Sequence, residues 1–237
     1  MTGSSPIVVV GAGGGVGATM LAGGIALARV RTGILTQLVE LDLEQGDIAG
    51  AWSAPADRTI GDLVPVAVAR EVSPTHLRAA RHAHESGVAL LLAPGRPGSS
   101  VPWDDDATRG LLDAAAADGE VVVDGGSRLL GPAASACAYA PVVLLVAPAS
   151  LSGARRALRM REALVERCPG REPRLVVNLG SGLPELGASA LGIATGMEVA
   201  AILPRSDREA GELSAGRWPR SRRGGLSMAV AGLAEAF

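Results

Sequence analysis

The sequence of 237 residues contains no lysine, since all 22 of its basic residues are arginines. Any chemistry that needs a side-chain amine is therefore excluded at the start. Cysteine is almost absent too. The two that are present, Cys137 and Cys168, have the spacing of neither a disulfide framework nor a metal site. We expect both to be buried thiols in a protein of a reducing compartment.

Long hydrophobic runs and a strong charge excess are also missing. The longest apolar runs, such as residues 141–148, are far shorter than the roughly 20 residues that cross a bilayer. Residues 1–6 are polar and uncharged, unlike a secretory signal or a transit peptide. A net charge of −2 argues against a protein dominated by nucleic-acid affinity. We expect a cytoplasmic protein without a transmembrane segment.

Short β-branched runs alternate with longer stretches of helical period, which is typical of an α/β fold with one doubly wound, mostly parallel sheet and helices on both faces. Hydrophobic residues make up 48% of the chain, enough for one core, so a single domain over residues 1–237 is expected. The pattern predicts seven strands, at residues 7–10, 34–41, 88–93, 120–123, 142–146, 174–177 and 199–203. It predicts helices at residues 17–31, 74–83, 105–117, 132–138, 153–167, 185–195, 206–215 and 226–235. Segments rich in glycine and proline at 93–102, 168–173 and 217–225 are predicted to be surface loops.

A glycine-rich turn follows the first predicted strand and leads directly into a helix. Glycines allow the backbone N–H groups to turn around an anion, and the helix start adds positive potential. The alternative is a tight turn without a ligand. The pattern favours phosphate binding by Gly13, Gly14, Gly15, Val16, Gly17, Ala18, Thr19 and Met20.

Dinucleotide-binding folds use the same loop physics, and the spacing of Gly11, Gly15 and Gly17 matches that of short-chain dehydrogenases. Those enzymes resemble one another also in a catalytic Tyr-x-x-x-Lys. This chain has a single tyrosine, Tyr139, and no lysine. Dehydrogenase activity of that kind is therefore excluded.

The segment Gly13-Gly-Gly-Val-Gly-Ala-Thr19 resembles Lys-Gly-Gly-Val-Gly-Lys-Thr, the deviant Walker A loop of the ParA/MinD group of P-loop NTPases. Gly13 and Ala18 stand where that group has its two lysines. In the family, the first lysine reaches the partner's nucleotide across a nucleotide-dependent homodimer. The second holds the β- and γ-phosphates. Neither contact can form in this chain.

Two further segments resemble this family. Residues 38–49 look like the Asp-Leu-Asp-Leu-Gln-Phe-Gly-Asp-Val-Ala stretch of its CpaE/TadZ pilus-assembly branch, although Glu40 replaces the usual aspartate. Residues 120–126 have the form of a Walker B strand. The resemblance implies that Asp42 is the catalytic, water-orienting carboxylate and that Thr19, Asp42 and Asp124 hold magnesium, mostly through water. Asp124 could instead cap the next turn.

The family's two base-binding segments have weaker counterparts. The resemblance implies that Asn178, after a predicted strand, reads adenine, and that Pro204, Ser206 and Asp207 frame the ring. An asparagine after a strand is also an ordinary turn residue, and Pro-x-x-Asp is an ordinary helix start. Both interpretations stay open.

The remaining candidate groups have simpler explanations. The three histidines His76, His82 and His84 lie in a stretch predicted to be helical but lack i, i+4 spacing, so we expect surface residues. The run at residues 104–106 is expected to cap a helix in preference to binding a metal. A solvated helix face is favoured over a partner- or DNA-binding face for Arg155, Arg156, Arg159, Arg161 and Arg167.

Loss of the phosphate lysine should weaken ATP binding by roughly ten- to a hundredfold, because a charge-assisted contact contributes about 1.5–3 kcal/mol. Binding of ATP or ADP with magnesium would survive, whereas fast hydrolysis would not. The pattern resembles actinobacterial CpaE-like, septum-site-determining proteins. It implies a positioning or scaffold factor for Tad/Flp-type pilus secretion machinery or the division septum, held at the membrane periphery by secretion or division proteins. Alternatives are a slow ATPase that uses an arginine in trans and an interaction module that binds no nucleotide.

The carboxyl-terminal segment, residues 226–237, corresponds in position to the membrane-binding helix with which MinD ends. Here the segment is rich in small residues and has little bulky apolar area. We expect it to pack on the domain.

Overall fold

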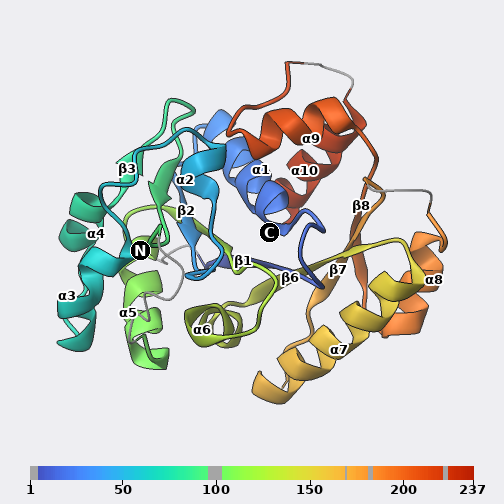
Figure 1. Ribbon diagram of the computed structural model, residues 1–237, viewed down its shortest axis with the longest axis horizontal. Helices are drawn as coiled ribbons and strands as arrows, with labels where there is room; N and C mark the ends of the chain where they lie inside the picture. Colours follow the sequence, from blue (N-terminus) through green and yellow to red (C-terminus); the bar gives the residue numbers. More distant parts are fainter. Residues whose placement is uncertain (1–4, 96–102, 169, 181–183, 221–223) are drawn as a thin grey trace.

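The computed structural model describes residues 5–95, 103–168, 170–180, 184–220 and 224–237. Residues 1–4 of the uncharged amino terminus and parts of the three predicted loops lie outside this range. Eight strands form one sheet in the order β3-β4-β2-β5-β1-β6-β7-β8 (Figure 1). They are β1 (Ile7–Gly11), β2 (Thr36–Glu40), β3 (His82–Ala83), β4 (Ala89–Leu91), β5 (Glu120–Asp124), β6 (Val142–Pro148), β7 (Arg174–Asn178) and β8 (Val199–Leu203). Only the β3–β4 pair is antiparallel.

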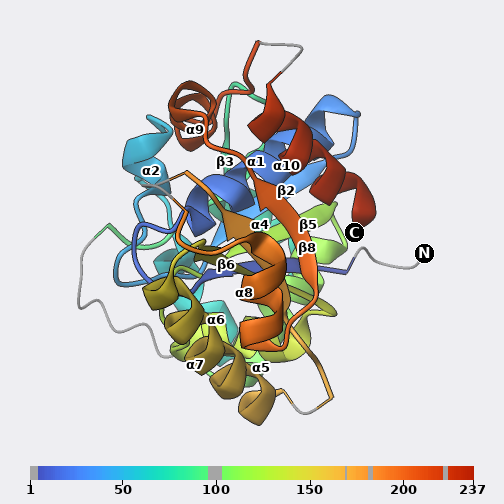
Figure 2. The same cartoon turned by 90° about the vertical axis from the view of Figure 1, so that its right-hand side faces the viewer.

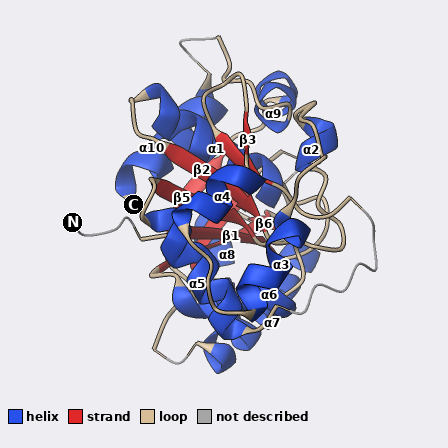
Figure 3. Ribbon diagram, turned by 90° about the vertical axis from the view of Figure 1, so that its left-hand side faces the viewer, coloured by secondary structure: helices blue, strands red, loops and turns tan. Residues whose placement is uncertain are grey.

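Helices cover both faces of the sheet, as Figures 2 and 3 show from its two sides. One face packs against α1 (Ala18–Arg31), α2 (Ile48–Ala51), α9 (Asp207–Ser214) and α10 (Gly225–Ala236). The other face packs against the 3-10 helix η1 (Ile60–Leu63), α3 (Val64–Val68), α4 (Pro74–Ala80), α5 (Asp105–Ala116), α6 (Gly131–Tyr139), α7 (Leu151–Arg167) and α8 (Ala188–Thr195). The predicted doubly wound α/β architecture is confirmed.

The central strand β1 shows why the sheet is buried on both sides. Val8 and Val10 face one core, whereas Ile7 and Val9 face the other, and all four are at most 2% exposed. A strand buried on both faces must be apolar at every position. Strands β2 to β5 lie on one side of β1, and strands β6 to β8 lie on the other. Sheets of this kind bind ligands in the crevice beyond the carboxyl end of the strand at which the order changes direction, which here is β1.

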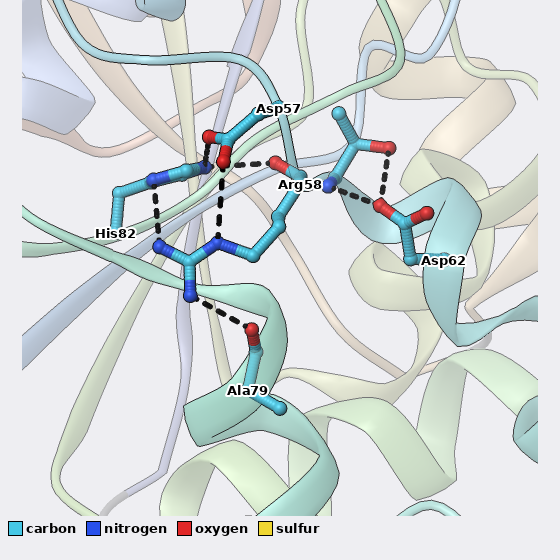
Figure 4. Close-up of polar contacts among 6 residues, drawn as sticks. Asp57, Arg58, Asp62, Ala79 and His82 are labelled. Atoms are coloured by element: carbon cyan, nitrogen blue, oxygen red, sulfur yellow. Dashed lines mark hydrogen bonds and ion pairs between the residues drawn. The ribbon is translucent and has the colours of Figure 1, made fainter.

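The eighth strand, β3, lies within residues that the pattern assigned to a helix over 74–83. Helix α4 ends at Ala80 because Arg81 has an extended backbone, and His82 then pairs with Leu90 of β4. The His82 ring is 2% exposed and makes two contacts with Arg58, at 2.9 Å to its carbonyl and 3.2 Å to its guanidinium (Figure 4). The prediction that His82 is a helical surface residue is therefore wrong.

The other two histidines are partly buried. His84 lies beside the indole of Trp52, with ring centroids 5.0 Å apart, and its Nε2 lies 3.2 Å from the Trp52 carbonyl oxygen. His76 is in α4 and lies 3.1 Å from the Glu71 carbonyl. Both side chains take part in local packing or hydrogen bonding. His76 and His84 are therefore not the purely surface residues that the sequence predicted.

Element boundaries differ from the sequence pattern where caps or short turns decide them. Helix α7 starts two residues earlier than predicted because Ser150 caps it, accepting from the Gly153 N–H at 3.0 Å. Helix α8 starts three residues later than predicted. The short elements α2, η1 and α3 were not predicted, because a segment of four or five residues is too short to show a helical period.

Three expectations are confirmed: both cysteines are buried, the acidic run caps a helix, and the last helix packs on the domain. Cys137 and Cys168 are free and buried, and burial raises the pKa of Cys137 to about 12. Asp104 caps α5, accepting from the Ala107 N–H at 2.8 Å. Helix α10 packs on α1 through buried Val230. Within the described ranges, no helix is both long enough and apolar enough to cross a membrane.

Candidate functional site

The glycine turn between β1 and α1 is anchored at its base and open at its tip. The Gly11 N–H donates to the Gly126 carbonyl at 2.7 Å, so the start of the turn is tied to the end of β5. Gly15 and Gly17 have φ of 70° and 94°, a left-handed conformation that glycine adopts without strain. No atom lies within 4 Å of where a Cβ would be on Gly14 or Gly15. The backbone at the tip is therefore accessible to a ligand.

A cavity of about 340 Å³, which we call the loop cavity, opens above this turn. Its size is in the range of small-molecule sites. It brings together all eight predicted phosphate-loop residues and Asp42. It is lined by Gly13, Gly14, Gly15, Val16, Gly17, Ala18, Thr19, Met20, Asp42, Gln45, Gly126, Ser127 and Ser214.

Asp42 is positioned by both segments that follow strands β2 and β5. Its Oδ1 accepts from the Gln45 N–H at 3.1 Å, and its Oδ2 lies against Gly126. Gly126 has φ of 63°, and any Cβ there would overlap the Asp42 carboxylate. An ion pair between Arg128 and Glu44 joins the same two segments. The predicted water-orienting carboxylate therefore faces the loop cavity in a fixed position.

Asp124 lies below the cavity at the end of β5 and is 1% exposed. Its Oδ1 accepts from the Gly126 N–H at 3.0 Å, so it does cap the following turn. Burial raises the pKa of Asp124, the Asp42 charge raises it further, and hydrogen bonds from Thr19 and Gly126 oppose the rise. A cation near Asp124 would relieve this unfavourable burial of charge.

The residues present fit a magnesium ion only if a ligand completes its shell. Thr19 is exposed in the cavity next to Asp124, and Asp42 faces it from the other side. Among the described residues, no group of three or more histidine, cysteine or acidic side chains could hold a metal alone. Mg²⁺ usually takes one or two protein ligands together with phosphate oxygens and waters. Thr19, Asp42 and Asp124 suit that arrangement.

Glu40 holds the loop after β2. Its two oxygens accept from the N–H groups of Ile48 and Ala93, both at 2.9 Å, and the residue is 1% exposed. Burial raises its pKa to about 7 against the effect of these hydrogen bonds. Glu40 also lies against Gly46, where a Cβ would be 2.6 Å from its Oε1. Both oxygens have partners, so Glu40 supports the site without lining it.

The four predicted adenine-binding residues do not line the loop cavity. Asn178 contacts the turn itself, because its Nδ2 donates to the Val16 carbonyl at 2.8 Å and its Oδ1 accepts from the Gly180 N–H at 2.8 Å. Ser206 caps α9. Asp207 is exposed and pairs with Arg205 at 3.2 Å, and Pro204 lies beside Gly225. A role of Asn178, Pro204, Ser206 and Asp207 at the base remains a prediction.

Besides Gly126, four residues at or beside the cavity were not recognised as site residues in the sequence. Gln45, Ser127 and Ser214 reach it from loops and from the end of α9. The fourth is Arg156 of α7, whose guanidinium lies against Gly13. Arg155, Arg159 and Arg167 are exposed, as expected of a solvated face, and Arg161 pairs with Glu172. Arg156 departs from that expectation, because its helix begins beside the turn.

Solved structures with this architecture include ParA and MinD ATPases. A ParA family ATPase from Chlorobium tepidum TLS matches with a TM-score of 0.84 at 16% identity, covering 99% of both chains. MinD in the MinC:MinD cell division complex of Aquifex aeolicus matches with a TM-score of 0.78 at 18% identity, over 98% of this chain and 95% of that chain. This chain has the fold of the ParA and MinD ATPases.

The septum site-determining protein MinD from Pyrococcus horikoshii OT3, complexed with Mg-ADP, matches with a TM-score of 0.76 at 17% identity, over 98% of this chain and 95% of that chain. No family model matches the sequence, and no curated protein matches it. The likeness to ParA and MinD therefore rests on three-dimensional structure.

Proposed function

We propose that this chain is a ParA/MinD-type nucleotide-binding protein that binds ATP or ADP with magnesium weakly and hydrolyses ATP slowly or not at all. The observation that supports this most directly is the loop cavity. It combines an accessible glycine turn with Thr19 and Asp42, yet Gly13 and Ala18 stand where the two lysines would be.

The roles of the residues follow from their positions. The N–H groups of the turn and of the start of α1 bind the phosphates, whose negative charge the helix dipole favours. Thr19, Asp42 and Asp124 would hold magnesium, mostly through water, and the ion would neutralise phosphate charge. Asp42 orients a water. The group that would stabilise charge on the transferring phosphate is absent at position 18, which lowers the rate of transfer more than it lowers binding.

We propose further that the protein serves as a positioning or scaffold factor, for Tad/Flp-type pilus secretion machinery or for the division septum. The fold supports this, since MinD of Aquifex aeolicus occurs in a complex with the cell division protein MinC. Nucleotide-dependent dimerisation would supply the switch. Partners of the secretion or division apparatus would then hold the protein at the membrane periphery.

Calorimetric titration with Mg-ATP of the wild type beside Ala18→Lys tests this function. The lysine should tighten binding by roughly ten- to a hundredfold, because it adds a charge-assisted contact to the phosphates. The exposed Ala56→Lys is the matched control, since it adds the same charge far from the loop cavity. No heat with either the wild type or Ala18→Lys would instead identify an interaction module without nucleotide.

Turnover separates the scaffold from the slow ATPase. We expect phosphate release by the wild type to be indistinguishable from background. Hydrolysis clearly above background that disappears in Asp42→Ala would contradict the scaffold and favour a slow enzyme. Size measurement with and without Mg-ATP then shows whether the nucleotide drives dimerisation.

A further inference from the structure

We propose that Arg156, from α7, is a phosphate-binding residue of the loop cavity and supplies the positive side chain that the glycine turn itself lacks. This inference rests on the proposed function, because it assigns a new residue to the same nucleotide site. The turn itself supplies no such cation, since the chain has no lysine, and none of the described residues that line the cavity is basic.

The geometry places the Arg156 guanidinium on the turn. A Cβ built on Gly13 would lie 2.9 Å from its terminal Nη1 and 3.4 Å from both Cζ and Cδ, so the end of the side chain packs along the backbone there. Strand β6 brings the helix to this position, because it pairs with β1 up to Gly11 and Ser150 then caps α7. Arg156 is thus delivered by two rigid elements.

The guanidinium has no carboxylate partner among the described residues, in contrast to three other arginines. Arg128 pairs with Glu44, Arg161 with Glu172 and Arg205 with Asp207. Arg156 forms no ion pair with any described residue, and its Nε is buried without a hydrogen-bond partner. A buried donor without an acceptor is unfavourable. A phosphate held by the turn would accept from the terminal guanidinium nitrogen Nη1, which lies against Gly13.

The absence of a side chain at position 13 and the presence of Arg156 depend on each other. Even a methyl group on Gly13 would force the guanidinium to move, because its Nη1 lies in that space. An arginine also suits the task chemically, since its planar fork can bind two phosphate oxygens at once. Gly13 stands where the ParA/MinD group has its first lysine. Because Gly13 has no side chain, it leaves room for the Arg156 guanidinium, which comes from α7.

The test is a calorimetric titration with Mg-ADP of the wild type, Arg156→Gln and Arg155→Gln. Arg155 is the matched control, because it is the neighbouring arginine on the same helix and is exposed. We expect Arg156→Gln to weaken binding by about tenfold to a hundredfold and Arg155→Gln to leave it unchanged. Arg156→Lys, which keeps the charge, should retain part of the affinity.

A salt series distinguishes a phosphate contact from structural support of the turn. Raising the ionic strength should weaken Mg-ADP binding less steeply in Arg156→Gln than in the wild type, because one charge-charge contact is missing. Arg156→Met, which keeps an apolar stem of similar length but removes the charge, should give the same direction of change. It also serves as the test if Arg156→Gln fails to fold.

The outcomes separate this inference from the proposed function. Equal Mg-ADP affinity of the wild type and Arg156→Gln, or of the wild type and Arg156→Met, would overturn the role of Arg156 and leave the nucleotide site standing. Weakening with an unchanged salt slope would also overturn it, because the arginine would then act only as support. If the wild type binds no nucleotide, both the function and the inference fall.

Discussion

The two sides of the nucleotide site proposed for this protein differ in how they are built. On the phosphate side, the turn after β1 and the segments after β2 and β5 converge on one cavity. On the base side, after β7 and β8, Asn178 bonds to the turn, and Asp207 pairs with an arginine away from the cavity. The positions of backbone N–H groups are determined once the strands are in place. The positions of side chains on loops depend in addition on the local contacts that each side chain makes.

The largest expected effect is on the phosphate side, at Gly126. Replacement by alanine imposes a left-handed conformation on a residue with a Cβ and pushes against Asp42. We expect the free energy of unfolding to fall by about 2–4 kcal/mol and Mg-ADP binding to be lost. Urea denaturation and calorimetry measure the two effects.

Gly131 provides the control for that substitution. Its φ of 50° is also left-handed, but a Cβ there would meet no atom within 4 Å. Gly131→Ala should cost only about 1 kcal/mol and leave Mg-ADP binding intact. Equal effects of the two alanines would show that the contact with Asp42 does not matter.

The next effect concerns Glu40 and is pH-dependent. We expect Glu40→Gln to lower the free energy of unfolding by about 1–3 kcal/mol at pH near 5, since one of two backbone N–H groups loses its acceptor. The folded-state pKa is raised from 4.5 to about 7. The stability that protonated Glu40 contributes is therefore complete below pH of about 4.5 and is lost as the pH rises through about 7.

The deficit of Glu40→Gln should accordingly shrink between pH of about 5 and about 8, because only the wild type loses stability over that range. Urea denaturation of both proteins across this range measures the difference. A deficit that stays constant or grows with pH would mean that Glu40 is ionised throughout.

A smaller effect is expected on the base side, at Asn178. Removing its two hydrogen bonds in Asn178→Ala should lower the free energy of unfolding by about 1–2 kcal/mol. Because the side chain supports the turn, we expect the affinities for ATP and GTP to fall by the same factor. A loss confined to ATP would instead support the adenine-reading role and make the two sides of the site alike.

The smallest effect is expected at Asp207. Its side chain is 73% exposed, and its pairing with Arg205 is a surface contact. Asp207→Asn should change neither the thermal unfolding midpoint nor the Mg-ADP affinity measurably. A clear loss of Mg-ADP affinity would place this residue at the base after all.

The contrast between the two sides also explains what the sequence could predict. β1, the glycine turn and α1 follow from an apolar run, glycines and a helical stretch, each recognisable in a few neighbouring residues. Asp42 and Asp124 were expected from the resemblance of residues 38–49 and 120–126 to segments of the ParA/MinD group, and their roles stay predictions. Local sequence therefore predicted the backbone of the phosphate side.

The features that sequence did not predict depend on contacts between distant segments. β3 has two residues and exists because His82 packs against Arg58, 24 positions away. Arg156 reaches Gly13 only because β6 pairs with β1. In the sequence, Arg156 is one of five arginines in a polar stretch, and nothing local distinguishes it from Arg155. Arg155 and Arg156 can be told apart only in the folded protein, where the sheet places Arg156 beside the turn.

The central claim, that a glycine turn without lysines still binds nucleotide phosphates, is tested most directly by following the backbone amide resonances of Gly14, Gly15 and Gly17 during titration with Mg-ADP. The account predicts large, saturable shifts of these three resonances, while that of Gly33, beyond the opposite end of α1, stays unchanged. Amide resonances of the turn that do not move at saturating Mg-ADP would contradict it.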